Sequence, residues 1–525
     1  MTLDAPILLP HQFNAAEYFV DRHIAEGRGD KVAIECGDEY VTYRQLFEHV
    51  NQVGNGLRNL GVRMEERVFL LLLDTPDFAA CFFGAIKIGA VPVPVNTLLK
   101  PPDYEYLLNN SRARVAIVSH SLFAAIDTIP RGRLLYLETI VLVGGEPRSG
   151  TLPFDRLRDK SFSTLKAEPT SRDDAAFWLY SSGSTGQPKA CVHLQHDMVV
   201  SVERYAKGIL NITEKDRFFS VAKLFFAYGL GNGLYFPLAV GATSILLPDP
   251  PRPQSVFEVI ERHRPTLFFS VPSNYVKLLA HPAAEGLEFD LATVRHAVSA
   301  GEALPAAVFH RFKERFKVEI LDAIGSTEAL HMMISNAPGA VRPGSSGKII
   351  PGFEARIVDD SNQAVAQGAI GSLLVKADST CAFYWNQHER TKDTIEGHWI
   401  RTGDKYYQDA DGYYWYAGRS DDMQKVSGVW VSPIEIESVL IEHPTVQEAA
   451  VVFRQDTDEL PKPVACIVPC EGVAGTPELA RELQEFVTNR LPIFKRPRWV
   501  EFLPELPKTA TGKIQRFKLR ARISG

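Results

Sequence analysis

Residues 176–189 read Ala-Phe-Trp-Leu-Tyr-Ser-Ser-Gly-Ser-Thr-Gly-Gln-Pro-Lys, an apolar run followed at once by glycines, hydroxyl residues and a lysine. The apolar part, 176–180, predicts a buried strand, and the glycines let the next residues turn tightly and approach a ligand closely. Exposed backbone N–H groups, hydroxyls and one cation suit the oxygens of a polyphosphate. The loop is not a Walker A motif, because the Gly-Lys-Ser/Thr ending is missing. A flexible surface turn is the alternative for a generic Gly/Ser loop, and the full strand-to-lysine pattern argues against it.

Short apolar runs and amphipathic stretches alternate on both sides of this loop, which is typical of α/β architecture. The predicted strands are 68–73, 91–95, 114–118, 139–143, 176–180, 244–247 and 266–271, and 78–88 predicts the helix after the first of them. After about Leu373 the pattern changes to short segments rich in Tyr and Trp, such as 411–417. Those segments predict antiparallel strands with tight turns.

The chain divides into two predicted domains, because 525 residues exceed what one hydrophobic core supports. A compact unit follows the sequence Gly-Arg-Ser-Asp-Asp at 418–422. It contains a predicted helix with Thr476 as N-cap and Pro477 in first position. That helix should end near Leu491, because Pro492 follows it. We expect a large domain over 1–420 and a small one over 421–525.

Composition argues against several classes of protein. Apolar residues make up 45% of the chain and charged residues 23%, and the net charge of −6 with both signs interspersed does not indicate nucleic-acid binding. The amino terminus lacks the pattern of a signal peptide, and the longest apolar runs are too short to span a membrane. The six cysteines are scattered without a CxxC pair, which favours structural roles over a disulfide or metal site. We expect a cytoplasmic protein that binds neither nucleic acid nor membrane.

Three further motifs carry candidate chemistry. Leu321-Asp-Ala-Ile-Gly-Ser-Thr-Glu328 follows a strand-like run and could place a carboxylate on Mg²⁺. Thr402-Gly-Asp404 places a carboxylate on a turn, where it could accept hydrogen bonds from the hydroxyls of a ribose. Pro507-Lys-Thr-Ala-Thr-Gly-Lys513 sets a lysine just after a Thr-Gly turn. Taken alone, each has a common alternative: a solvated or capping Glu, an ordinary Gly-Asp turn and a solvated lysine.

These motifs stand in one order between residues 180 and 513, and with them the chain resembles the adenylate-forming superfamily of acyl-CoA synthetases, peptide-synthetase adenylation domains and beetle luciferase. The resemblance runs from about Phe13 to Arg522. Within the superfamily the chain is most similar to the benzoate–CoA ligases. The similarity rests on the sequence segments FWLYSSGSTG, AKLFFAYGLGNG, SAGEALP, IGSTE, GDKY, YAGRSDDMQKVSG, VSP and PKTATGKIQRFKLR. The resemblance implies a large, multi-lobed N-terminal α/β domain that binds ATP and the acid, and a small, mobile C-terminal α+β domain.

The resemblance also implies an activity, that of an acid–CoA ligase with ATP, Mg²⁺ and coenzyme A. A small aromatic carboxylic acid and ATP would give acyl-AMP and pyrophosphate, and coenzyme A would then take the acyl group and release AMP. A homodimer is compatible with the resemblance. Alternatives are delivery to a carrier protein, or another small acid such as hydroxybenzoate, furoate or cyclohexane carboxylate. A non-enzymatic nucleotide-binding protein is disfavoured by the joint presence of Lys513, Glu328 and Asp404.

The resemblance assigns most of the motif residues to ATP. The loop around the phosphates comprises Ser181, Ser182, Gly183, Ser184, Thr185, Gly186 and Lys189. The segment of Gly301, Glu302 and Ala303 would lie along the adenine, and Asp322 would accept a hydrogen bond from its 6-amino group. Asp404 would hold the ribose hydroxyls, with Arg419 close to the ribose and the phosphates.

Four residues carry the implied chemistry and motion. Thr327 would contact the phosphates and Glu328 would bind Mg²⁺, while Lys513 would bridge the acid and the α-phosphate during adenylation. Asp421 occupies the position of the hinge about which the small domain rotates between the two half-reactions. Carboxylate attack on phosphorus brings two anions together, so a fixed ammonium and a cation stabilise the transition state more than the ground state.

The implied acid pocket rests on the same comparison. Its residues are Phe226, Ala227, Tyr228, Gly325, His331 and Met332, with Lys425 acting in one of the half-reactions. Tyr228 has an ordinary core aromatic as its alternative, His331 a structural histidine and Lys425 a solvated lysine.

The sequence departs from the common superfamily pattern in four places. Ile324 replaces a Tyr, so adenine stacking would be aliphatic, and Ala190 replaces a Gly after the phosphate loop. Phe226 and Gln195 stand where many acyl-CoA ligases have His. The Ile and Phe changes are shared with the benzoate group and favour that narrower assignment.

Overall fold

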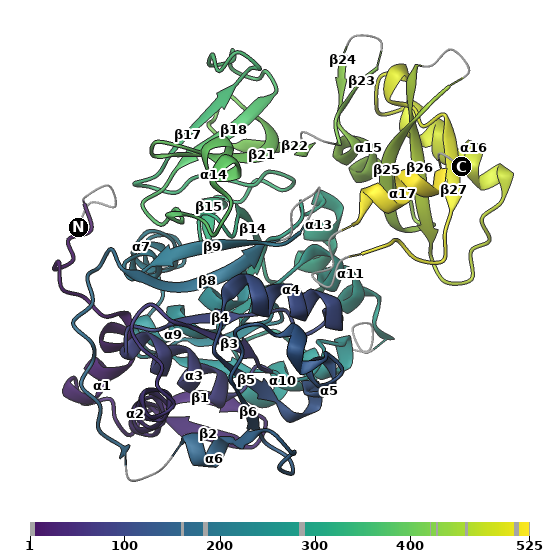
Figure 1. Cartoon of the computed structure of the whole chain (residues 1–525). Coiled ribbons are helices and arrows are strands. Elements are labelled where there is room, and N and C mark those ends of the chain that lie inside the picture. Colours follow the sequence, from purple (N-terminus) through teal and green to yellow (C-terminus); the bar gives the residue numbers. More distant parts are fainter. Residues whose placement is uncertain are drawn as a thin grey trace.

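The computed structural model describes residues 6–158, 162–181, 187–282, 289–419, 422–426, 429–456, 460–508 and 514–523. Two mainly parallel sheets occupy the lower half of the view in Figure 1, and the antiparallel strands β17, β18 and β21 lie above them. The C-terminal part, in yellow and yellow-green, stands at one edge. No helix among the described residues has the length and apolar character needed to cross a membrane.

The first sheet has the strand order β4-β3-β5-β6-β7 and is parallel throughout. Its strands are β3 (Arg67–Leu71), β4 (Val91–Pro94), β5 (Val115–Ser119), β6 (Thr139–Val143) and β7 (Leu152–Pro153). The apolar runs that predict strands here are confirmed, and they are apolar throughout because a parallel sheet is covered on both faces. The predicted helix after β3 is confirmed as α3 (Pro76–Lys87).

The second sheet has nine strands in the order β16-β15-β14-β13-β12-β10-β11-β1-β2. They are β1 (Val32–Cys36), β2 (Glu39–Thr42), β10 (Arg217–Ser220), β11 (Thr243–Leu246), β12 (Leu267–Ser270), β13 (His296–Ser299), β14 (Ile320–Gly325), β15 (Met332–Ser335) and β16 (Lys348–Ile349). The central strands pair in parallel, and β2, β15 and β16 add antiparallel edges. The carboxyl ends of β12, β13 and β14 therefore meet at one edge of the sheet, where α/β proteins place their ligands.

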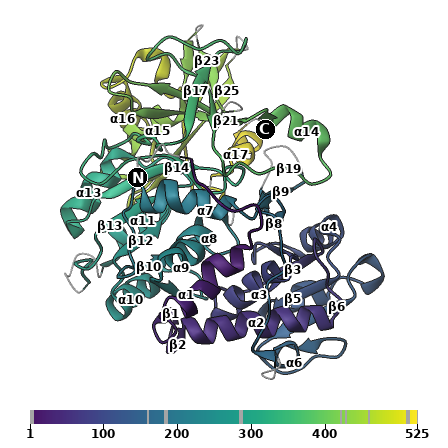
Figure 2. The ribbon, with the colours of Figure 1, turned by 90° about the vertical axis from the view of Figure 1, so that its left-hand side faces the viewer.

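One hydrophobic core lies between these two sheets. The helices of the N-terminal part are α1 (Arg22–Ala25), α2 (Tyr43–Asn59), α3, α4 (Pro101–Ser111), α5 (Ala124–Asp127), α6 (Phe154–Leu157), α7 (Asp197–Ser201), α8 (Ala227–Leu230), α9 (Phe236–Val240), α10 (Pro253–His263), α11 (Pro272–Ala280), α13 (Ala306–Phe316) and α14 (His388–Thr394). Figure 2 shows α2, α3 and α9 between the sheets, and they contribute Leu46, Phe83 and Phe236 to the core. That core extends to Leu70 of β3 and Phe269 of β12, so it joins the two sheets into one body.

Antiparallel strands complete the N-terminal part. A three-stranded sheet consists of β8 (Ala175–Ser181), β9 (Lys189–Leu194) and β19 (Phe383–Tyr384). A five-stranded sheet consists of β17 (Glu354–Val358), β18 (Gly371–Lys376), β20 (Ile395–Glu396), β21 (Trp399–Gln408) and β22 (Tyr414–Arg419). The antiparallel arrangement predicted after Leu373 is confirmed.

The prediction that Asp404 lies on a turn is wrong, because the structure places it inside β21. The register of β21 on β18 passes from Lys405 opposite Ser372 to Arg401 opposite Leu374, so extra residues bulge out of the ladder between them. Gly403 has a φ of +76°, which only glycine adopts readily. The Thr-Gly-Asp signal therefore marks a bulge rather than a chain reversal.

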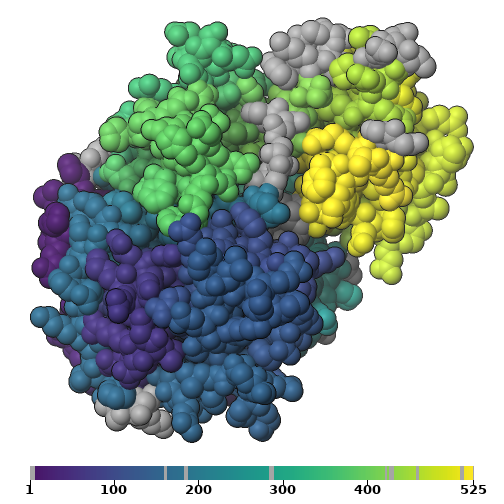
Figure 3. All heavy atoms as spheres, in the orientation of Figure 1, coloured from purple at the N-terminus to yellow at the C-terminus, as the bar shows by residue number. Residues whose placement is uncertain are grey.

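The C-terminal part has its own sheet and its own core. Its elements are β23 (Gln424–Val426), β24 (Val429–Val431), α15 (Pro433–Ile441), β25 (Val446–Gln455), β26 (Pro461–Pro469), α16 (Pro477–Thr488), β27 (Trp499–Phe502) and α17 (Arg516–Ile523). Two buried clusters consist only of residues from Val431 onward. Figure 3 shows this part beside the rest of the molecule rather than within it. Cys466 is buried in β26, and all six cysteines are free thiols.

The start of α16 is confirmed and its predicted end is wrong. The Thr476 hydroxyl accepts a hydrogen bond from the Leu479 N–H, with Pro477 in first position. The helix ends at Thr488 instead of near Leu491. Its last turn tightens, because the Arg490 N–H donates to the Val487 carbonyl three residues back.

Candidate active site

The β8–β9 loop is the first part of the candidate site. Ser181 and Lys189 face each other in register at its two ends, so both predicted phosphate contacts stand at the mouth of the loop. The other predicted phosphate residues, Ser182–Gly186, lie outside the described residues.

Helix α4 holds the loop on both sides. Before the loop, the Tyr180 hydroxyl donates a hydrogen bond to Asn110 Oδ1 at 2.7 Å. After it, the Tyr106 hydroxyl donates to the Pro188 carbonyl oxygen at 3.0 Å. Two hydrogen bonds from one rigid element fix the distance between the ends of the loop.

A charged cluster lies at the mouth of this loop. Lys189 Nζ lies 2.8 Å from Glu328 Oε1, although the two residues come from motifs far apart in the sequence. The Tyr384 hydroxyl accepts from Lys189 Nζ at 2.7 Å and donates to Glu328 Oε1 at 2.8 Å. The Ser181 hydroxyl also donates to Glu328 Oε1, at 3.4 Å. The structure thus brings together three of the predicted nucleotide residues and adds Tyr384.

Glu328 is held as a carboxylate. Burial alone would raise its pKa, but the charge and hydrogen bond of Lys189, with the hydrogen bond of Tyr384, outweigh burial and lower the pKa to about 2. A buried carboxylate that stays ionised across the physiological pH range is a suitable ligand for a hard cation.

Thr327 is placed through its backbone. Its carbonyl oxygen accepts a hydrogen bond from His193 Nε2 at 2.8 Å, and His193 Nδ1 lies 2.8 Å from Asp197 Oδ2. His193 and Asp197 are both fully buried, so the segment before Glu328 is fixed from within the protein. Gln195, two residues along, serves structure: its Oε1 accepts from the Ala15 N–H at 2.9 Å.

The predicted adenine wall lies at the carboxyl ends of β13 and β14. Asp322 pairs in register with Ser299, and the segment 301–303 follows directly, with Gly301 at a φ of +93°. Asp322 Oδ2 accepts a hydrogen bond from the Leu304 N–H at 3.4 Å. Burial raises the pKa of Asp322 to about 8 against the opposing effect of its hydrogen bonds. Its carboxyl group is therefore buried at the sheet edge that parallel strands use for ligands.

The predicted ribose residues are cross-strand partners. Asp404 of β21 lies opposite Arg419 of β22, and Arg419 Nη1 donates to Asp404 Oδ1 at 3.0 Å. The same nitrogen donates to the Thr402 carbonyl at 3.1 Å, across the bulge at Gly403. The bulge therefore aims the carboxylate and the guanidinium at one place.

Tyr228 lies in α8, against the ends of two parallel strands. Phe226 is the N-cap of this helix, and Ala227 begins it. The Tyr228 hydroxyl donates to the backbone carbonyl oxygens of Ser270 (3.2 Å) and Val298 (3.1 Å). Its ring is thereby anchored at the edge where β12 and β13 end.

His331 and Met332 close the other side of the predicted pocket. The His331 ring lies 4.5 Å from the Phe236 ring and 5.8 Å from the Tyr228 ring, between centroids, and burial lowers its pKa to about 3. A neutral imidazole among aromatic rings leaves this wall uncharged. Met332 pairs with Gly325, where a Cβ would come within 2.4 Å of the His331 carbonyl oxygen. Only glycine fits there.

Comparison with known protein families decides where the chain belongs. The family model described as "AMP-binding enzyme" matches residues 21–385, and the one described as "AMP-binding enzyme C-terminal domain" matches residues 435–513. The chain is an AMP-binding enzyme. The predicted superfamily is thereby confirmed.

Three of the proteins similar to this AMP-binding enzyme are CoA ligases of aromatic acids. A benzoate–CoA ligase of Thauera aromatica is 48% identical over 98% of this chain and 97% of its own length. The crystal structure of the anthranilate CoA ligase AuaEII in complex with anthranoyl-AMP matches with a TM-score of 0.94 and 45% identity, over 98% of each chain. A benzoate CoA ligase of Burkholderia xenovorans LB400 matches with a TM-score of 0.89 and 44% identity, over 97% of this chain and all of the other. The predicted similarity to the benzoate group is confirmed.

The residues of the charged cluster fit a magnesium complex of ATP. Glu328 and Ser181 present carboxylate and hydroxyl oxygens, which are the ligands that Mg²⁺ prefers. Lys189 brings a cation to the same place, as polyphosphate binding requires.

The predicted hinge residue, Asp421, and the predicted catalytic lysine, Lys513, lie outside the described residues. The side chain of Lys425 also lies outside them. Their described neighbours are tied together. Arg520 Nη1 donates to Asp422 Oδ1 at 2.6 Å, and Arg516 Nη2 donates to both oxygens of Glu437 at 2.7 and 2.8 Å. The residue after Asp421 is thus bound to α17, which begins three residues after Lys513.

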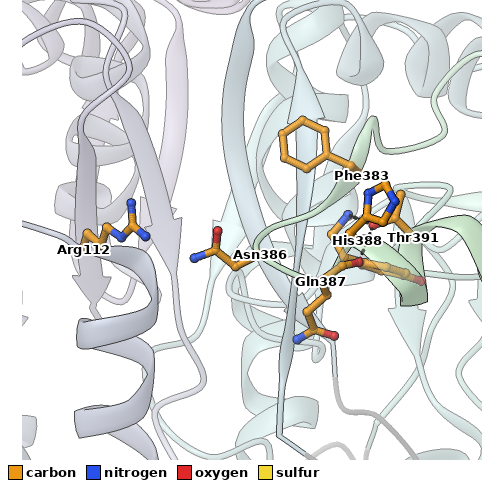
Figure 4. A pocket seen from close by; sticks show the side chains of 7 residues that line it. Arg112, Phe383, Asn386, Gln387, His388 and Thr391 are labelled. Atoms are coloured by element: carbon orange, nitrogen blue, oxygen red, sulfur yellow. Dashed lines mark hydrogen bonds between the residues drawn. The ribbon is translucent and has the colours of Figure 1, made fainter.

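An open groove has Tyr384 among its lining residues. Its volume is about 610 Å³, and Arg112 forms one wall and residues of the 383–391 segment the other (Figure 4). None of the predicted acid-pocket residues line it. Tyr384 therefore separates this groove from the charged cluster.

Tyr384 and His193 are the functional candidates that sequence reasoning missed. Tyr384 acts through strand pairing, since it is brought to Lys189 by β19 lying on β9, and His193 acts through its hydrogen bond to the Thr327 carbonyl. A two-residue strand has no periodicity to read. His193 had one usable signal, because it stands two residues before Gln195 in the His-x-His position.

Proposed function

We propose that this AMP-binding enzyme is an ATP-dependent ligase that activates a small aromatic carboxylic acid as its acyl-adenylate and transfers the acyl group to coenzyme A. The observation that carries the proposal is the short segment 325–332. It contributes Glu328 to the charged cluster, and it contains Gly325, His331 and Met332, which we assign to the acid pocket and of which His331 lies among aromatic rings. One stretch of chain thus joins the residues assigned to the phosphates to those assigned to the acid.

The adenylation step needs charge compensation. A carboxylate oxygen of the acid attacks the α-phosphorus of ATP, the new O–P bond forms, and pyrophosphate leaves. Lys189 and Ser181 hold the phosphates, and Glu328 holds Mg²⁺, which when bound supplies positive charge to the polyphosphate. Lys513 is assigned to the oxygens between acid and α-phosphate, where an ammonium stabilises the pentacoordinate transition state.

The thioester step uses the second part of the chain. The coenzyme A thiolate attacks the acyl carbon of acyl-AMP, a C–S bond forms, and AMP leaves with the electron pair of the broken C–O bond. We assign residues 1–420 to the domain that holds ATP and the acid, 421–525 to the domain that carries Lys513, and Asp421 to the hinge between them. This assignment is supported by the separate core of the C-terminal part.

The acid we propose is benzoate or a close relative. Tyr228, His331 and Met332 make an uncharged wall with a neutral imidazole, which suits an uncharged aromatic ring better than a charged chain. The closest alternative is an aminobenzoate, because the anthranilate ligase AuaEII shares 45% of the sequence and the whole fold. The six free thiols are compatible with a reducing cytoplasm.

A panel of carboxylic acids tests this function. Benzoate, 2-aminobenzoate, 4-hydroxybenzoate, furoate, cyclohexane carboxylate and octanoate are compared by pyrophosphate release and by AMP formation, each with and without coenzyme A. We expect the aromatic acids to give the highest rates. Without coenzyme A, pyrophosphate release should stop after a single turnover, and continuous AMP formation should require coenzyme A. A preference for octanoate would contradict the aromatic pocket. AMP formation at the same rate with and without coenzyme A would contradict the assignment of coenzyme A as the acyl acceptor.

A further inference from the structure

Tyr384 is held in place by its backbone, independently of its hydroxyl group. It pairs with Cys191 in register on β9, and the residues on both sides donate to the same strand: Ala382 N–H to Val192 and Trp385 N–H to Ala190. Its ring is 1% exposed. The hydroxyl is therefore free to serve a purpose other than fixing the residue.

The hydroxyl lies between two ions of opposite charge. It accepts from Lys189 Nζ at 2.7 Å and donates to Glu328 Oε1 at 2.8 Å, while Lys189 Nζ and Glu328 Oε1 are 2.8 Å apart. The three groups form a closed triangle. A tyrosine hydroxyl keeps its proton at physiological pH, so it stays a donor to the carboxylate.

We propose that Tyr384 is a positioning residue for the magnesium complex of ATP. Before ATP binds, Lys189 and Glu328 compensate each other. When Mg²⁺ and the phosphates arrive, Lys189 turns to the phosphates and Glu328 to the metal. The neutral Tyr384 hydroxyl stays hydrogen-bonded to Lys189 and Glu328, and it holds the Glu328 carboxylate in place while both residues change partners. This inference rests on the proposed function, because it takes the roles of Lys189 and Glu328 from it.

A purely structural role for Tyr384 predicts something different. The ring fills the space between the charged cluster and the open groove of Figure 4, and phenylalanine would fill it equally well. Removing the hydroxyl leaves Glu328 and Lys189 as a direct ion pair without the group that bonds to both of them; the Ser181 hydroxyl still donates to Glu328, at 3.4 Å. That direct pair competes with metal and phosphate. Tyr384→Phe should therefore weaken the effect of Mg²⁺ on ATP binding while the fold is retained.

Calorimetric binding of α,β-methylene-ATP, with and without Mg²⁺, measures this effect in the full chain. The wild type should bind more tightly with Mg²⁺, and in Tyr384→Phe that gain should shrink about tenfold, as expected for one hydrogen bond to a charged group. Affinity without Mg²⁺ should change little. Tyr43→Phe is the matched control, because Tyr43 is equally buried and its hydroxyl donates one hydrogen bond, to the Ala242 carbonyl at 2.7 Å.

A second background separates positioning from a general loss of stability. In Glu328→Gln protein, adding Tyr384→Phe should not change the increase in nucleotide affinity that Mg²⁺ causes. The Glu328 carboxylate, through which Tyr384 acts, is already absent there. An undiminished Mg²⁺ gain in Tyr384→Phe, or the same loss in Tyr43→Phe, overturns the inference. Failure of the proposed ligase function is distinguishable from failure of this inference. If the proposed function is wrong, the wild-type protein forms no acyl-AMP, whatever the binding data show.

Discussion

Gly403 shows how a residue without a side chain can fix a neighbouring ion pair, that of Arg419 and Asp404. A Cβ at this position would come within 2.8 Å of Arg419 Nη2, and the φ of +76° would strain any L-residue by about 1–2 kcal/mol. Gly403→Ala should therefore push the Arg419 guanidinium away from Asp404. We expect several-fold weaker ATP binding, seen as a raised KM for ATP, together with lower thermal stability.

Gly412→Ala is the matched control for that prediction. Its φ is +84°, and a Cβ there meets nothing closer than Gln408 Nε2 at 3.9 Å. Both variants should lose similar stability through backbone strain, and only Gly403→Ala should raise the KM for ATP. Equal KM values in the two variants would show that the bulge does not position Arg419 for the nucleotide.

At the residue scale, the sequence predicts charged groups better than their neutral partners. Lys189 and Glu328 stand in motifs whose residue types suit phosphate and metal, and the structure brings them to 2.8 Å. Tyr384 stands in no such motif, because strand pairing brings it to the site. His193 is marked only by its His-x-His position, and its role arises from burial. Asp404 is an intermediate case: the motif predicts the carboxylate but not the bulge that carries it.

At the scale of elements, the apolar runs predict the buried parallel strands to within a few residues, because both faces of such strands must be apolar. The short strands β16, β19 and β20 could not be predicted, since two residues carry no periodicity. The end of α16 was misplaced because Pro492 sets only the latest point at which a helix can stop.

Two described residues near Lys513, Lys508 and Ile514, are held in place by their surroundings. Lys508 and Ile514 form an antiparallel bridge, and Lys508 Nζ contacts both oxygens of Glu448 at 2.7 and 2.6 Å. Lys513→Ala should reduce adenylation by several kcal/mol of transition-state stabilisation and leave transfer from preformed acyl-AMP to coenzyme A nearly intact. Rates of the two half-reactions are measured separately.

Lys518→Ala controls for the loss of one positive charge in the same region, because Lys518 is an exposed lysine on α17. It should affect neither half-reaction. Equal losses of both half-reactions in Lys513→Ala would remove Lys513 from the adenylation step.

At the scale of the whole molecule, the described residues form two separate cores, one from residues up to Tyr416 and one from Val431 onward. The core of the large part lies between the two parallel sheets, and the clusters of the C-terminal part share no residue with it. Asp422 is tied by Arg520 and Arg516 to α17, so it belongs to the C-terminal part. Any rotation of that part must therefore be absorbed before Asp422, which supports the assignment of the hinge to Asp421.

Asp421→Pro tests that assignment. Proline fixes φ near −65°, so a residue that must change its backbone conformation between the two half-reactions is held in one of them. Acyl-AMP should still form, measured as a pyrophosphate burst, while thioester production falls at least tenfold. Asp421→Ala, which removes the carboxylate without fixing φ, should retain both steps. If thioester forms normally in Asp421→Pro, the rotation is absorbed elsewhere, and because Asp422 is bound to α17, the search would move to the residues before 421.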